Sequence, residues 1–338
     1  MKIHFSAIVI SLLAVGVGCQ NEAPTTARSG GAGSSGRETA EPGGAEGTRA
    51  RGGAGGSSVD GVADCCAGGG APPQKTACAG PSIGVNQLTS SSVAPAGEVH
   101  LSELIATSQK FLVFRSSAGS CLWGVFVSED VSVAAPGTGL LIVSYGDAAG
   151  DASAGACPTG TDAIPDDVRS GDVLEAHGKT SSFVSSSCSR PIAPQFQLRA
   201  SKACPLLRSG HRAPPAPAEL DFSTADRIAT ASEPNLLQAW GNLLVRLQAV
   251  SGRPADAGSI VGRFGVVRLN ETLLEVHDEL YWNDLSAGGP GAFGKQPVFG
   301  AGTSFSRIDG ILHLDFCSWS LNPRNKCSDF EPKSENCP

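Results

Sequence analysis

The sequence predicts an all-β protein in which two small barrels follow a long disordered tether. Two observations lead to this fold class. After residue 97, short apolar runs are separated by Gly, Pro, Ser and Asp, which is the pattern of many short strands. The runs stop at a Pro-rich stretch around residue 214 and then begin again, so the folded part divides into two similar halves.

The first half, residues 98–206, is expected to form one barrel. The apolar runs place its strands at 111–115, 122–127, 139–145, 171–179 and 195–199. Each run is bounded by turn-forming residues, as strands of small barrels are. Residues 207–228 follow as an extended Pro-rich connector, because a proline biases the residue before it away from the helical region.

The second half, residues 229–338, repeats the pattern. Its strands are expected at 243–250, 264–269, 273–282, 305–316 and 319–321. One short helix is expected at 233–240, with Ser232 as its N-cap, Pro234 in its first turn and Gly241 just after its end.

The start of the chain has the pattern of an export signal. Lys2 supplies a positive charge, residues 5–17 are apolar, and small residues lead to Cys19. Residues 1–18 resemble a bacterial lipoprotein signal, which implies cleavage before Cys19 and a lipid on that cysteine. Gly16 departs from the pattern, since a larger aliphatic residue usually stands there, and an ordinary secretory signal is the alternative. Gln20 is not the Asp that marks inner-membrane retention in similar proteins, which favours the outer membrane or the cell surface.

Residues 19–97 are expected to be an intrinsically disordered linker. Gly, Ser, Ala and Pro dominate, and no aromatic residue occurs from residue 20 to 97. A segment of this composition cannot bury enough apolar surface to offset the entropy lost on ordering.

Charge and cysteines narrow the function classes. The formal net charge of −7 disfavours a general nucleic-acid binder, which needs positive charge against phosphates. Eleven cysteines suit an exported protein with disulfides. Two bridges are expected in the first half and one near the C-terminus, either Cys317–Cys327 or Cys327–Cys337. The first-half candidates are Cys121, Cys157, Cys188 and Cys204, whose pairing the sequence does not decide.

A family resemblance supports the two-barrel prediction. Residues 302–330, GTSFSRIDGILHLDFCSWSLNPRNKCSDF, are similar to the end of an OB-fold-like module of bacterial exported proteins, including modules attached to secreted nucleases. The matching residues are Gly310, Ile311, Leu312, Phe316, Leu321, Pro323, Arg324 and Asp329. Residues 101–204 resemble the same module more weakly. The resemblance implies two OB-like barrels and says little about the ligand; no nuclease domain accompanies them.

Two groups of side chains are candidates for a site. Five aromatic residues could form a platform on which bases or sugar rings stack, with core packing as the alternative: Trp123, Phe126, Tyr281, Trp282 and Trp319. His277, His313 and Asp315 could hold a metal or act as an acid–base pair, with an ordinary solvated strand face as the alternative.

The function predicted from these features is a lipid-anchored binding protein of the cell envelope. Its partner is expected to be a glycan or an envelope protein ahead of nucleic acid, and no cofactor is expected. The alternative is a metal-assisted hydrolase or an accessory subunit of a secreted nuclease, with its site near His277 and His313. A third possibility is an envelope spacer without a ligand. No nucleophile elbow, Walker motif or dinucleotide motif occurs.

Overall fold

The computed structural model describes residues 78, 80–90, 97–116, 120–147, 157–183, 193–231, 233–255, 258–262, 265–282, 299–315, 317–335 and 337. All of them lie within one compact unit, residues 69–338. Strands far outweigh helices in this part, which confirms the predicted all-β class. The signal of residues 1–18, Cys19 and most of the expected tether lie outside the described residues. No helix in the described part is long and apolar enough to cross a bilayer.

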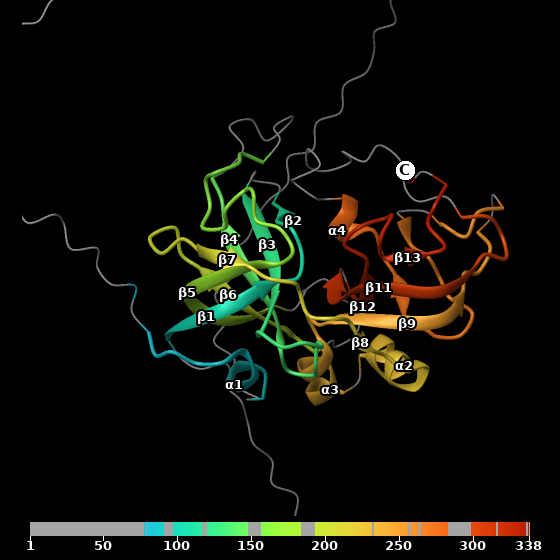
Figure 1. The fold of residues 1–338 in the computed structure, drawn as a ribbon, viewed down its shortest axis with the longest axis horizontal. Helices are drawn as coiled ribbons and strands as arrows, with labels where there is room; N and C mark the ends of the chain where they lie inside the picture. The colour runs from blue at the N-terminus through green and yellow to red at the C-terminus, as the bar shows by residue number, and fades with distance from the viewer. Residues whose placement is uncertain are drawn as a thin grey trace, which may run out of the picture. The chain divides into compact units, whose positions relative to one another are not determined.

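The first barrel is a closed ring of five strands: β1 (Glu98–Ala106), β3 (Cys121–Ser128), β4 (Gly139–Tyr145), β5 (Asp172–Phe183) and β6 (Gln195–Ala200). Pairing runs β1-β3-β4-β6-β5 and returns to β1 (Figure 1). The β4–β6 pair is parallel, and the other pairs of the ring are antiparallel. This strand order matches the five-stranded Greek-key barrel of the OB type.

The second barrel repeats this order with a less regular ring. Its ring contains β9 (Leu244–Ser251), β10 (Glu275–Val276), β11 (Ser304–Asp315) and β12 (Ser318–Asn322). β11 pairs antiparallel with β9 and β12, whereas β10 and β12 are parallel. Two single bridges, Gly252 to Leu269 and Val267 to Val276, close the ring. Both halves are therefore OB-like, as predicted.

Two expected strands of the second half differ from the structure. Of the expected strand 264–269, residue 264 lies outside the described part and residues 265–269 contribute single bridges, whereas 273–282 contains β10 followed by the helix α4 (Glu279–Trp282). Val276 and His277 are both buried, which breaks the two-residue alternation that a longer strand would need.

Outside the rings, the first half has two further strands. β2 (Phe111–Arg115) pairs with β3, and β7 (Leu207–His211) pairs with β5. In the second half, β8 (Ala218–Glu219) pairs with β9, and β13 (Phe330–Glu331) pairs with β11.

The prediction of an extended connector at 207–228 is wrong. β7 and β8 lie in this segment, and α2 (Phe222–Thr230) begins in it. Asp221 caps α2, because its carboxylate accepts a hydrogen bond from the backbone N–H of Thr224. The predicted helix at 233–240 is confirmed as α3 (Pro234–Trp240), with Gly241 as its C-cap. Its N-cap is Glu233, one residue after the expected Ser232.

The folded part also begins earlier than the expected boundary at residue 97. α1 (Val85–Ser90) lies in the segment assigned to the tether. Val85 and Leu88 are three residues apart, and both are buried in the core of the first barrel. Two apolar side chains on one helical face are enough to dock this turn against the barrel.

Three disulfides are described. Cys121–Cys157 lies within the first half, Cys78–Cys204 ties the N-terminal segment to the first barrel, and Cys327–Cys337 lies near the C-terminus. The expected pairing of Cys204 within residues 98–206 is therefore wrong, because Cys78 belongs to the fold rather than to the tether. Cys317 is also disulfide-bonded. Cys188 lies outside the described residues.

Two strands of the first barrel are covered on both sides. Trp123, Val125, Leu140 and Ile142 fill the interior of this barrel. Between them, Leu122, Phe126, Leu141 and Val143 point outward and share a core with the second barrel. As a result, β3 is buried along its whole length, and so is β4 up to Tyr145.

Candidate functional site

The predicted aromatic platform is not present as an exposed surface. Trp123, Phe126, Tyr281 and Trp319 are each no more than 2 % exposed. Trp123 faces the inside of the first barrel, and the other three lie in the core that includes the second barrel. The platform interpretation is wrong for these four, because each side chain is packed in a core and offers no face on which a ring could stack. The side chain of Trp282 lies outside the described part.

The interface between the barrels explains this burial. His313 of β11 packs edge-on against Phe126, with ring centroids 5.2 Å apart, and against Phe111, at 6.3 Å. Ligands of OB-type barrels commonly bind on the face of the second and third strands. In the first barrel these are β3 and β4, so the second barrel occupies the face that would otherwise serve for binding.

His277 and Asp315, two of the predicted site residues, do meet. The Nδ1 atom of His277 lies 2.7 Å from Oδ2 of Asp315, and its Nε2 lies 3.4 Å from Oε2 of Glu275. Burial alone would lower the pKa of His277, but the bonds to the two carboxylates raise it to about 9. The bond from His277 lowers the pKa of Glu275 to about 2, with further help from Arg268.

These values describe an ion pair at neutral pH. The raised pKa favours the protonated form of His277, and the carboxylates of Asp315 and Glu275 lie at different nitrogens of its ring, so the three groups do not converge on one point. Glu275 is ionised and is held in place from two sides, since Nε of Arg268 lies 2.8 Å from its Oε1 atom. The three predicted residues therefore do not form a metal-ligand set in this arrangement.

His313 lies in a separate, deeper group. Its Nδ1 is 2.8 Å from Nε2 of Gln195, and its Nε2 is 3.2 Å from Oε2 of Glu279. Gln195 also donates to the side chain of Asn242. With the Gln195 amide donating, Nδ1 of His313 accepts, and Oε2 of Glu279 is left without a hydrogen bond. Burial raises the pKa of Glu279. This group joins the two barrels and is closed to solvent.

A pocket opens beside the His277–Glu275 pair. It has a volume of about 290 Å³ and is lined by Ala229, Thr230, Leu273, Glu275, Ser318 and Trp319. Leu273 is 60 % exposed, and the indole Nε1 of Trp319 is buried without a hydrogen-bond partner. The pocket therefore combines an ionised carboxylate, an apolar surface and a hydroxyl on Ser318.

Its position follows from the topology of the second barrel. β10 and β12 are parallel, so both begin at the same end of the ring. Residues 273–275 and 318–319 meet there, next to the end of α2. Asp226 of α2 holds the turn before β10 by accepting from Thr272 Oγ1 and Leu273 N, both at 2.7 Å.

Sequence reasoning missed Glu275 and Leu273. The signal for Glu275 was its place two residues before His277, which puts both side chains on one face of a strand. No sequence feature pointed to Leu273, because an apolar residue in a predicted strand is expected to pack in the core.

A larger pocket, of about 430 Å³, lies on the first barrel between the segment before α1 and the bulge of β1. It carries the carboxylates of Glu103, Glu129 and Asp130. Arg212 contacts Glu103 and Asp130, and Glu129 accepts from the backbone N–H of Asn86. Its charged groups are therefore already paired.

Comparison with known proteins gives no family assignment. No family model matches the chain, and no curated protein does. Among solved structures, the chain is similar to a deletion mutant of the single-stranded DNA binding protein from Thermus aquaticus, at 12 % identity over 68 % of this chain and 91 % of that one. The TM-score of 0.20 is too low to support an argument about function.

Proposed function

We propose that this protein is an exported binding protein of the cell envelope, anchored by a lipid on Cys19, whose second barrel binds a neutral glycan. The pocket beside Glu275 and Trp319 carries the proposal. The described disulfides are of the kind that persists in an oxidising compartment, which supports export. The lipid follows from the signal-like sequence before Cys19.

The chemistry of the pocket suits a sugar ring. Ionised Glu275 and Ser318 accept hydrogen bonds, as sugar hydroxyl groups require. Trp319 forms part of the pocket wall, and Leu273 offers an exposed apolar surface. Small-molecule sites combine a few placed polar groups with apolar walls in this way.

The charge of the chain argues against a phosphate ligand. A net charge of −7 disfavours the approach of an anion, and the two cationic side chains beside the pocket, Arg268 and His277, are already paired with Glu275. Nucleic acid is therefore the less favoured partner.

Binding of soluble cell-wall glycan fragments, measured by calorimetry alongside single-stranded oligonucleotides, tests this function. Glycan binding should be lost in Glu275→Gln and weakened in Leu273→Ser. Leu207→Ser, which alters a residue of the first barrel that is 53 % exposed, is the matched control. Binding of oligonucleotides that weakens steeply with salt, without glycan binding, would contradict the proposal.

A further inference from the structure

We propose that His100, Glu175 and His177 form a binding site for one Zn²⁺ ion on the first barrel. The site is separate from the pocket of the second barrel and does not depend on the function proposed above. Among the residues that the structure describes, this is the one group of three that could offer converging ligand atoms to a metal.

The strand register brings the three side chains together. β1 and β5 are antiparallel, and His100 lies directly opposite His177. Glu175 precedes His177 by two residues, so both point to the same side of β5. Leu174 and Ala176, which alternate with them, face the core of the first barrel. The three polar side chains therefore lie on its outer side.

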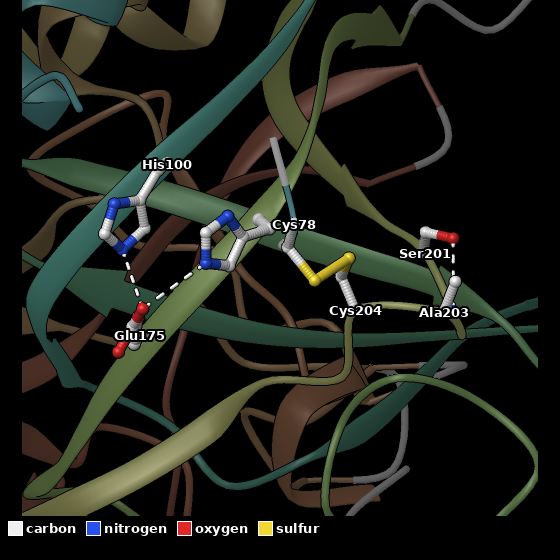
Figure 2. Close-up of a disulfide and its surroundings, with 7 residues drawn as sticks. Cys78, His100, Glu175, Ser201, Ala203 and Cys204 are labelled. Atoms are coloured by element: carbon white, nitrogen blue, oxygen red, sulfur yellow. Dashed lines mark hydrogen bonds and ion pairs between the residues drawn. A yellow bond between two sulfur atoms is a disulfide. The ribbon is translucent and has the colours of Figure 1, made fainter. Parts of the chain in front are cut away.

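The distances fit a cluster that a cation can join. Oε1 of Glu175 lies 2.9 Å from Nε2 of His100 and 3.3 Å from Nε2 of His177. The two rings are stacked, with centroids 4.2 Å apart and planes 3° from parallel. In Figure 2 two dashed lines end on Glu175, one of them from His100, and one ligand atom from each of the three residues lies within 4.8 Å of the others.

The present contacts leave nitrogen atoms unsatisfied. Nε2 of His100 is buried, and although it lies 2.9 Å from the carboxylate, the angles do not make a hydrogen bond. Nδ1 of His177 is buried without a partner as well. Of these atoms, Nε2 of His100 faces the carboxylate oxygen that His177 already contacts, and a cation bound by all three side chains would satisfy it.

The donor set selects the type of ion. Two imidazole nitrogens and one carboxylate oxygen are a ligand set of zinc, whereas calcium and magnesium prefer oxygen ligands throughout. Ligand atoms around tetrahedral zinc lie about 3.4 Å apart, so side-chain rotations from the present separations are sufficient. The side chains of His100, His177 and Glu175 are 24 %, 14 % and 37 % exposed, which leaves a route for the ion. Three protein ligands also leave a fourth position for water or another ligand.

The backbone holds the ligands firmly. The N–H of His100 donates to Pro81 O at 3.0 Å, and its carbonyl accepts from Ile83 N at 3.1 Å. The Cys78–Cys204 disulfide, also drawn in Figure 2, fastens this N-terminal segment to the end of β6. His100 is thus fixed between the segment and β5, which is the support that a metal site requires.

Titration of the tag-free, metal-free protein with Zn²⁺ alone tests the proposal. We expect one ion per chain, and affinity at least about 100-fold lower in His100→Ala, His177→Ala and Glu175→Gln, since loss of mere supporting contacts already costs about 10–100-fold. His211→Ala is the matched control, because His211 is an exposed histidine on the neighbouring β7, and this variant should bind zinc as the parent does.

Two further measurements distinguish loss of a metal ligand from loss of the folded structure. The visible absorption of bound Co²⁺ reports directly on the ligands and should disappear in each of the three variants but not in the control. Thermal unfolding without metal should be nearly the same in Glu175→Gln and in the parent. The proposal is overturned if the parent binds no zinc, or if zinc binding survives in the three variants. Glycan binding is a separate measurement, so failure here and failure of the proposed function are distinguishable.

Discussion

His313 of the second barrel lies edge-on to Phe126 of the first, with ring centroids 5.2 Å apart. This contact stands at the centre of the shared core, and it explains why β3 and β4 are buried on both faces. The second barrel covers β3 and β4 of the first, the face on which OB-type barrels commonly bind a ligand. The proposed glycan pocket accordingly lies on the second barrel, and the proposed zinc site lies on the outer side of β1 and β5.

The shared core predicts that the two barrels unfold together. Phe126→Ala should cost about 3–5 kcal/mol, because it opens a cavity between the barrels as well as removing apolar contact. Urea unfolding should show one transition at a lower midpoint. Phe114→Ala, at a site on β2 that is 57 % exposed, should stay within about 0.5 kcal/mol of the parent. Two separate transitions in the parent protein would be inconsistent with a common core.

The contacts of His277 with Asp315 and Glu275 predict that the stability of the protein depends on pH. The pKa of His277 is raised from 6.5 to about 9, so its contribution to stability is complete below about pH 6.5 and is lost as the pH rises through about 9. The shift corresponds to about 3 kcal/mol at most. Unfolding midpoints at about pH 7 and about pH 10 should differ less in His277→Gln than in the parent. An equal difference in both proteins would show that the pair does not stabilise the fold.

The ion pairs of Lys110 are also expected to contribute to the stability of the fold. Its Nζ is buried and lies 2.6 Å from Oδ2 of Asp162 and 2.6 Å from Oδ1 of Asp166. Burial raises the pKa of Asp162 despite this bond. Lys110→Met should therefore destabilise the protein by about 3–5 kcal/mol, because it leaves a buried carboxylate unpaired.

Adding Asp162→Asn to Lys110→Met should recover part of that loss, since the unpaired charge is removed. Chemical denaturation of the single and double variants gives the free energy of unfolding of each. If the double variant is no more stable than Lys110→Met, the loss comes from packing of the lysine stem rather than from the charge.

The disulfides should differ in their effect on stability. Cys78–Cys204 spans 126 residues and Cys327–Cys337 only 10. On the chain-entropy relation, replacing the first pair by serine should cost about 5 kcal/mol and replacing the second about 3 kcal/mol. Thermal unfolding of the two double-serine variants compares them, and a larger loss from the C-terminal pair would contradict this order.

Several strands were predictable, because short apolar runs bounded by turn-forming residues are a local signal. The runs at 111–115 and 139–145 coincide with β2 and β4. The role of Phe126 was not predictable, since a strand buried on both faces loses its alternation and the covering barrel is distant in sequence. For the same reason the sequence did not show that Trp123 faces inward.

The candidate sites depended on register, which the sequence does not reveal. His277 and Asp315 are 38 residues apart, and only the pairing of β10 with β12 and of β12 with β11 brings them together. For the proposed zinc site, Glu175 and His177 stood on a predicted strand, but β1, which carries His100, was not expected. α2 was missed because the prolines before it were given more weight than Asp221, its N-cap.

Hydrogen exchange with and without soluble cell-wall glycan fragments tests the central claim most directly. The claim is that the second barrel covers β3 and β4 and itself carries the ligand pocket. Added glycan should slow exchange at residues 229–230, 273–275 and 318–319, while β3 and β4 exchange slowly with or without it. Fast exchange of β3 and β4 in the free protein, with glycan protection confined to those strands, would contradict the account.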